Sequence, residues 1–200
     1  MTVARRPAAV AALTLMFIAL CAVAGCAPAR VSPQARELLD QIDSIARKST
    51  REIHAAGDAK KEFIDLLSSE QQPAADTAKK AEALLLSSRH SEEQGLADIE
   101  QMQKLFEEVR LLHSSKELDS YSGMKLDALA QQRSLVGAEI EELDLRTQVL
   151  RQFAAGVTLD KLVQFEKKIA ELEARERDIA LKAKALQDDA NEYYREKKLG

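Results

Sequence analysis

The fold is decided by the stretch LVQFEKKIAELEARERDIALKAKALQDDANEY, residues 162–193. Alternating steps of three and four residues from Leu162 define ten positions over about five heptads, of which nine are apolar or amphipathic. These positions are Leu162, Phe165, Ile169, Leu172, Glu176, Ile179, Ala183, Leu186, Ala190 and Tyr193. A mean spacing of 3.5 residues is typical of helices that pack side by side at about +20°. The stretch therefore predicts a long helix with one face buried against a neighbour.

Three earlier parts of the chain show the same spacing less regularly. Residues that start or stop helices separate these parts from one another and from the last one. The resulting helical segments lie near residues 33–70, 73–113, 116–155 and 158–198. The boundary signals are Ser32 with Pro33, Pro73, a capping box of Ser114 and Glu117, and Gly156 before the N-cap Thr158. Such residues cap a helix, fit its first turn or end it. At 1.5 Å per residue, each segment would be roughly 60 Å long.

Composition favours the same fold class. Aromatic residues make up 4% of the chain and Trp is absent, which is poor material for a β-sheet. Abundant Ala, Leu, Glu and Lys lose little on entering a helix. We predict an all-α fold, an elongated antiparallel helical bundle or coiled-coil hairpins with about four long helices. Three further candidate breaks leave the helix count open: Gly57-Asp58, Ser91 to Gln94, and Ser120 to Gly123.

Two charged residues interrupt the predicted apolar seams. Glu176 lies in the seam of the last segment, and Arg133 lies in that of residues 116–155. If the chain reverses at Gly156, the two residues lie about one helical turn apart and can form an ion pair that fixes the register. Alternatively, each stem covers apolar surface while its charged head stays in water, and this is the interpretation that we favour.

The sequence contains no recognisable catalytic or metal-binding motif. The histidines are His54, His90 and His113, and none has a Glu three residues before it, as di-iron helical bundles require. No glycine-rich phosphate loop or nucleophile elbow occurs. Carboxylate pairs, such as Glu141-Glu142, are interpreted as solvated helix faces. We therefore expect a protein that is not an enzyme, with no catalytic, cofactor-binding or metal-binding residues.

The charge balance argues against nucleic acid as a partner. The chain has 29 Lys and Arg against 33 Asp and Glu, a net charge of −4. Without Arg5 and Arg6, the remainder has 27 basic residues against 33 acidic residues, a net charge of −6. A protein that binds nucleic acid usually presents a basic face.

The first 26 residues have the order of an export signal. Arg5 and Arg6 precede an uncharged apolar run from Ala8 to Val23, which ends in Val23-Ala24-Gly25-Cys26. This order resembles the signal peptide and lipobox of a bacterial lipoprotein. The resemblance implies cleavage before Cys26, a diacylglycerol on its thiol, and removal of Cys21 with the leader. The apolar run is shorter than the ~20 residues of a membrane-spanning helix; an uncleaved anchor and the twin-arginine export route are the alternatives.

The resemblance also implies a domain layout and a location. Residues 1–25 would be the cleaved signal peptide, residues 26–32 a lipidated tether, and residues 33–200 a single helical domain. In enterobacterial lipoproteins, a residue other than Asp after the cysteine favours the outer membrane. Ala27 therefore predicts the outer membrane, facing the periplasm, if the source has two membranes.

These features lead to two functional hypotheses. The first is a lipid-anchored scaffold or adaptor that contacts an envelope protein or itself, with no small-molecule substrate. The second is a periplasmic chaperone or carrier that shields an apolar ligand in a helical groove near Leu84-Leu85-Leu86. The C-terminal stretch from Tyr193 to Lys198 complements the helix dipole. Alternatively, it contacts a partner protein, a lipid surface or peptidoglycan.

Overall fold

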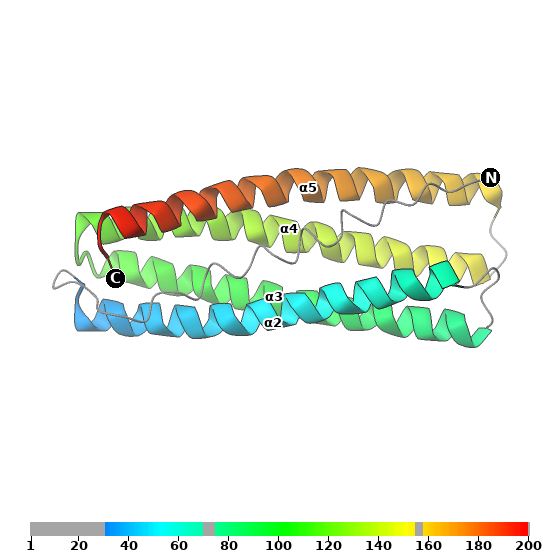
Figure 1. The fold of residues 1–200 in the computed structure, drawn as a ribbon, viewed down its shortest axis with the longest axis horizontal. Helices are drawn as coiled ribbons and strands as arrows, with labels where there is room; N and C mark the ends of the chain where they lie inside the picture. The colour runs from blue at the N-terminus through cyan, green and yellow to red at the C-terminus, as the bar shows by residue number, and fades with distance from the viewer. Residues whose placement is uncertain (1–30, 70–74, 155–157, 200) are drawn as a thin grey trace.

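The computed structural model describes residues 31–69, 75–154 and 158–199. They form four helices and no strand: α2 (Pro33–Ser69), α3 (Ala75–Leu111), α4 (Lys116–Ala154) and α5 (Leu159–Glu196). The helices run alternately up and down along one long axis (Figure 1). At 1.5 Å per residue, each is about 55 Å long. The predicted all-α, elongated antiparallel bundle is confirmed.

The predicted helix ends lie within two residues of the observed ones. The three candidate breaks inside the segments are wrong. α2 continues through Gly57, α3 continues through residues 91–94, and α4 continues through residues 120–123. Each of these sites has residues on both sides that pack into the core, so tertiary packing holds the helix together where local propensity is weak.

Serine hydroxyl groups cap the N-terminal ends of two helices. Ser32 Oγ accepts a hydrogen bond from the backbone N–H of Ala35 at 3.2 Å, as predicted for the N-cap of α2. For α4, the predicted cap Ser114 is wrong: the N–H of Leu118 donates to Ser115 Oγ at 3.1 Å. Ser114 instead shares a hydrogen bond with Ser32, Oγ to Oγ at 3.1 Å, and so ties the start of α2 to the turn before α4.

The predicted signals around the other two helix starts are tested only in part. Thr158 lies at the N-cap of α5 with extended backbone, but its side chain makes no capping hydrogen bond. Pro73 and Gly156 lie outside the described residues.

Each helix packs closely against the next one along the chain. The core has two apolar clusters. The proximal cluster, near the start of α2, draws on all four helices: Val31, Ala35, Ile42, Ala46, Ile99, Met102, Leu105, Phe106, Val109, Leu118, Tyr121, Leu129, Val136, Ala190 and Leu199. The distal cluster, toward the opposite end, consists of Phe63, Ala81, Leu85 and Leu143. Among the described residues, α5 adds no side chain to this distal cluster.

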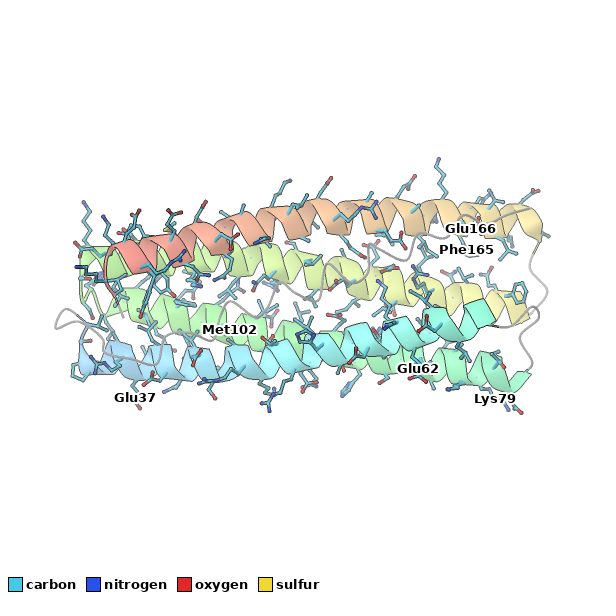
Figure 2. The ribbon with its side chains drawn as sticks, in the orientation of Figure 1. Glu37, Glu62, Lys79, Met102, Phe165 and Glu166 are labelled. Atoms are coloured by element: carbon cyan, nitrogen blue, oxygen red, sulfur yellow. The ribbon has the colours of Figure 1, made fainter. Side chains whose placement is uncertain are left out.

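The predicted seam of α5 is its packed face. All ten seam positions from Leu162 to Tyr193 are buried or half-buried. In Figure 2, Phe165 lies on the side of α5 toward α4, whereas Glu37 of α2 and Lys79 of α3 lie at the outer surface. None of the described helices has an apolar stretch long enough to cross a membrane.

Adjacent leucines of α3 provide a test of this packing. Leu85 is fully buried in the distal cluster, whereas Leu86 is 47% exposed. We expect Leu85→Ala to lower the free energy of unfolding by about 2–5 kcal/mol, because it removes packed methyl groups and leaves a cavity. Leu86→Ala, the matched control, should change it by less than about 1 kcal/mol. Equal losses in urea unfolding of the two variants would contradict the assigned face of α3.

Candidate functional site: a buried charged cluster

A group of charged side chains lies in the core where the proximal and distal apolar clusters meet. Glu142 has no exposed surface, and Glu176 and Glu92 are 3% and 5% exposed. The group draws on all four helices. It consists of Lys60 of α2, Glu92 of α3, Glu139, Glu142 and Arg146 of α4, and Glu176 of α5, and we call it the charged cluster.

Helix geometry brings these side chains together. Glu139, Glu142 and Arg146 follow one another at spacings of three and four residues, which places them on one face of α4. Glu176 occupies the seam of α5, where the apolar residues on either side hold it toward the core. Lys60 extends from α2 to α4, and so links two helices that are not neighbours along the chain.

Glu142 is the hub of the cluster. Lys60 Nζ donates a hydrogen bond to Glu142 Oε2. Arg146 Nε donates to Glu142 Oε1 at 2.6 Å, and its Nη2 lies 2.8 Å from Oε1 of Glu173 on α5. Both oxygens of the buried carboxylate therefore have cationic donors, which give stronger hydrogen bonds than neutral ones do.

The two cations keep Glu142 ionised. Burial alone would raise the pKa of Glu142, but the charges of Lys60 and Arg146 outweigh burial and hold that pKa below its ordinary value. Burial would likewise lower the pKa of Lys60, but Glu142 and then Glu176 raise it above its ordinary value. The Lys60 and Glu142 pair is therefore ionic at neutral pH.

Glu142 balances one of the two positive charges of Lys60 and Arg146. The three other carboxyl groups of the cluster outnumber the one positive charge that is left. Burial, and then repulsion from Glu139, raises the pKa of Glu92 to about 9. Burial, and then repulsion from Glu142, raises the pKa of Glu176 to about 8. Burial raises the pKa of Glu139 to about 7. Glu92 Oε2 and Glu176 Oε1 are buried without a hydrogen-bond partner, so the charged cluster retains protons at neutral pH that exposed carboxylates would release.

Solvent does not reach the centre of the charged cluster. The group's hub has no solvent-exposed surface, so a substrate has no open path to it in this conformation. Within the part of the chain that the structure describes, no set of three or more His, Cys, Asp or Glu side chains is arranged to hold a metal ion. Buried charges that must be paired can fix the register and partner choice of packed helices.

The structure corrects two interpretations of the sequence. Glu142 was expected on a solvated face and is fully buried. The candidate pair of Arg133 and Glu176 does not form. Arg133 Nη2 lies 2.8 Å from Oε1 of Glu100 on α3, where both side chains are largely exposed, because Arg133 lies on the face of α4 toward α3. We favoured the interpretation that the charged group of each side chain stays in solvent. It is confirmed for Arg133 and wrong for Glu176.

The sequence placed Glu176 in a helix seam but did not identify the other five residues of the cluster as buried. For the residues of α4, the spacing along the helix is a feature that predicts burial. Steps of three and four residues from the buried Leu118 lead through Tyr121 and Lys125 to Glu139, Glu142 and Arg146. Extending an apolar seam through its polar positions, instead of ending it there, would have placed these charges in the core.

The three histidines form no site. His90 and His113 are exposed, as expected, and His54 is half-buried. His113 Nδ1 lies 3.6 Å from Oδ2 of Asp119 at the surface. Cys26, the predicted lipidation site, and the predicted signal peptide lie outside the described residues.

A second buried cation lies in the proximal half of the bundle. Lys125 Nζ donates a hydrogen bond to Asn191 Oδ1 at 2.9 Å and lies 5.6 Å from the centre of the Tyr121 ring. Burial lowers the pKa of Lys125 to about 8. Tyr194 packs on Tyr121 with ring centres 4.9 Å apart. Tyr194 of the C-terminal stretch thus packs against α4 and joins α5 to it.

Comparison with known proteins adds no relative: no family model, curated protein or solved structure matches the chain.

The ion pair of Lys60 and Glu142 can be tested by removing one partner and then both. Lys60→Met should lower the free energy of unfolding by about 3–5 kcal/mol, because it leaves a buried carboxylate with one cation fewer. Adding Glu142→Gln should recover much of that loss, because the unpaired charge is then removed. Urea unfolding of Lys60→Met, Glu142→Gln and the double variant measures both effects. A double variant that is less stable by the sum of the single losses would contradict coupling.

The retained protons predict an unusual pH dependence of stability. Glu92, Glu139 and Glu176 have folded pKa values of about 9, 7 and 8, all above the unfolded value of 4.5. The folded state therefore binds more protons from about pH 4.5 to 8, and the free energy of unfolding falls as the pH rises through that window; above pH 8, the lowered pKa of Lys125 opposes this fall.

Glu92→Gln should flatten this pH dependence, because Gln mimics the protonated carboxyl group. We expect a gain of about 3–5 kcal/mol at pH 8 and of less than about 1 kcal/mol at pH 5. Glu107→Gln, on an exposed position of the same helix, is the matched control. Thermal and urea unfolding at both pH values gives the comparison. Parallel pH profiles for wild type and Glu92→Gln would show that Glu92 does not hold the proton.

Proposed function

We propose that the protein is a lipid-anchored helical scaffold or adaptor of the bacterial cell envelope, with no catalytic role. The observation that carries the proposal is the motif Val23-Ala24-Gly25-Cys26 after an apolar run, followed closely by the helical body that begins at Pro33. Each buried acyl CH₂ contributes roughly 0.8 kcal/mol, so a cysteine with two or three acyl chains stays on its membrane. Ala27 favours the outer membrane if the source has two membranes.

The shape of the body supports an adaptor role. A bundle about 55 Å long has the start of α2 at one end and the last turn of α4 and first turn of α5 at the other (Figure 1). Phe153 and Val163, near that far end, are 54% and 56% exposed. Exposed large apolar side chains at the far end are suited to a partner protein of the envelope or to a second copy of the chain.

The burial of the charged cluster supports a structural role. Lys60 is the one amine of the cluster, and Glu142 and Glu176 raise its pKa, which keeps it an ammonium ion and so neither a nucleophile nor a general base. The raised pKa values of Glu92, Glu139 and Glu176 would suit proton donors, but Glu142, at the centre of the cluster, has no exposed surface. Paired buried charges of this kind can hold four helices in one register.

One observation favours the alternative, a chaperone or carrier. The first half of α5 packs against α4 but adds no side chain to the described distal cluster, and its seam residues Leu162, Phe165 and Ile169 are only half-buried. Separation of α5 from α4 would expose these apolar seam residues, which could then bind an apolar ligand. Native mass spectrometry of the protein purified from membranes distinguishes the two. A bound apolar molecule, lost in Ile169→Asp but retained in the exposed control Lys168→Asp, would favour the carrier.

The anchor can be tested with the two cysteines of the chain. Cys26→Ser should abolish lipidation, because no thiol remains at the cleavage site, and leave an unlipidated precursor or a soluble form. Cys21→Ser is the matched control and should be lipidated normally, because Cys21 lies in the leader. Intact mass and membrane fractionation give the result. A Cys26→Ser protein with the normal mass and membrane retention would overturn the lipid anchor.

A further inference from the structure

One end of the bundle combines exposed cations with an exposed leucine. Figure 1 shows that the start of α2, the α3–α4 connection and the C-terminus of α5 lie together. The hydrogen bond between Ser32 and Ser114 joins two of these segments, and buried Val31 and Leu199 belong to the same apolar cluster. We call this part, residues 31–36, 108–119 and 195–199, the proximal end.

Leu111 is the most exposed large apolar side chain of the described residues, at 74%. It is the last residue of α3. The chain then turns sharply at His113, whose φ is 45°, before α4 begins at Lys116. Leu111 therefore projects from the turn at the end of the bundle instead of packing within it.

Four cations of the proximal end have no acidic partner among the described residues. Arg110, Lys116, Lys197 and Lys198 are exposed, and none of them is in an ion pair within the described part of the chain. Lys197 Nζ lies 5.6 Å from the centre of the Tyr193 ring, so its charge has an aromatic neighbour but no acidic one. These four side chains can therefore contact an anionic partner.

The proximal end is basic in a chain that is acidic overall. Its six cations are Arg36, Arg110, Lys116, Arg195, Lys197 and Lys198. Its four acids are Glu108, Glu117, Asp119 and Glu196. The proximal end therefore has a net charge of +2, whereas the whole chain has a net charge of −4.

We propose that the proximal end docks on a membrane surface rich in anionic phospholipid, with Leu111 in the interface and Lys197 and Lys198 against the head-group phosphates. This inference rests on the proposed lipid anchor at Cys26. Val31 is the fifth residue after Cys26, so an extended tether reaches at most ~18 Å. The surface potential of anionic lipids acts over about a Debye length, ~8 Å at physiological salt. The tether therefore keeps the proximal end within ~18 Å of the surface and lets it enter that range, and docking holds the bundle upright.

Spin labelling of the whole lipidated protein tests the docking. Lipid blocks Cys26, so Leu111→Cys supplies a single thiol for a nitroxide, and Phe153→Cys labels the far end as a control. In vesicles of phosphatidylglycerol and phosphatidylcholine, the label at residue 111 should be accessible to oxygen and shielded from a water-soluble nickel chelate. The label at residue 153 should show the reverse. In phosphatidylcholine alone, the shielding at residue 111 should fall.

Charge-reversal variants provide the second part of the docking test. Lys197→Glu with Lys198→Glu should return the label at residue 111 to water while the protein stays on the vesicle. Lys168→Glu with Lys182→Glu, at exposed positions of the same helix, makes the same change in charge and should leave the label shielded. Circular dichroism checks that each variant remains helical.

The outcomes separate docking from anchoring. The docking alone would be overturned if the protein is anchored but its label at residue 111 is as accessible to the nickel chelate as the label at residue 153. Shielding that needs neither phosphatidylglycerol nor Lys197 and Lys198 would overturn the head-group contact. A protein without the mass of a diacylglyceryl group on Cys26 would overturn both the anchor and the docking that depends on it.

Discussion

The ion pair of Lys60 and Glu142 is the constraint on which the rest of the bundle depends. Glu142 has no exposed surface, so its charge is tolerable only while Lys60 and Arg146 supply hydrogen bonds. Lys60 reaches it from α2, and Arg146 links it to Glu173 of α5. Sliding one helix by a turn would move these groups about 5.4 Å apart along the axis. The pair therefore selects one register among several that the apolar seams alone would permit.

The same constraint explains how the core is divided. Apolar residues fill the proximal cluster from all four helices and the distal cluster from α2, α3 and α4. Between them, Glu92 and Glu176 remain protonated because their pKa values lie at about 9 and 8. A buried polar layer costs stability relative to an apolar one. It contributes specificity, because only the native alignment of four helices satisfies it.

The elements differ in how far the sequence predicted them. The seam from Leu162 to Tyr193 predicted the buried face of α5, because five heptads leave little ambiguity in a 3.5-residue period. Gly57 lies inside a continuous helix, because packing overrides a weak local signal. Glu142 could not be told from its exposed neighbour Glu141 by residue type, since burial depends on which helices surround α4. Cys26, predicted from its motif, lies outside the described residues, so the anchor stays a prediction.

The central claim is that the bundle buries carboxyl groups that keep their protons at neutral pH. The most direct measurement is an NMR titration of the glutamate side-chain carboxyl carbons in the folded protein, with Glu92→Gln and Glu176→Gln used to assign the resonances. The account predicts midpoints above pH 7 for Glu92 and Glu176, and a midpoint below 4.5 for Glu142. Midpoints near pH 4.5 for all three groups would contradict it.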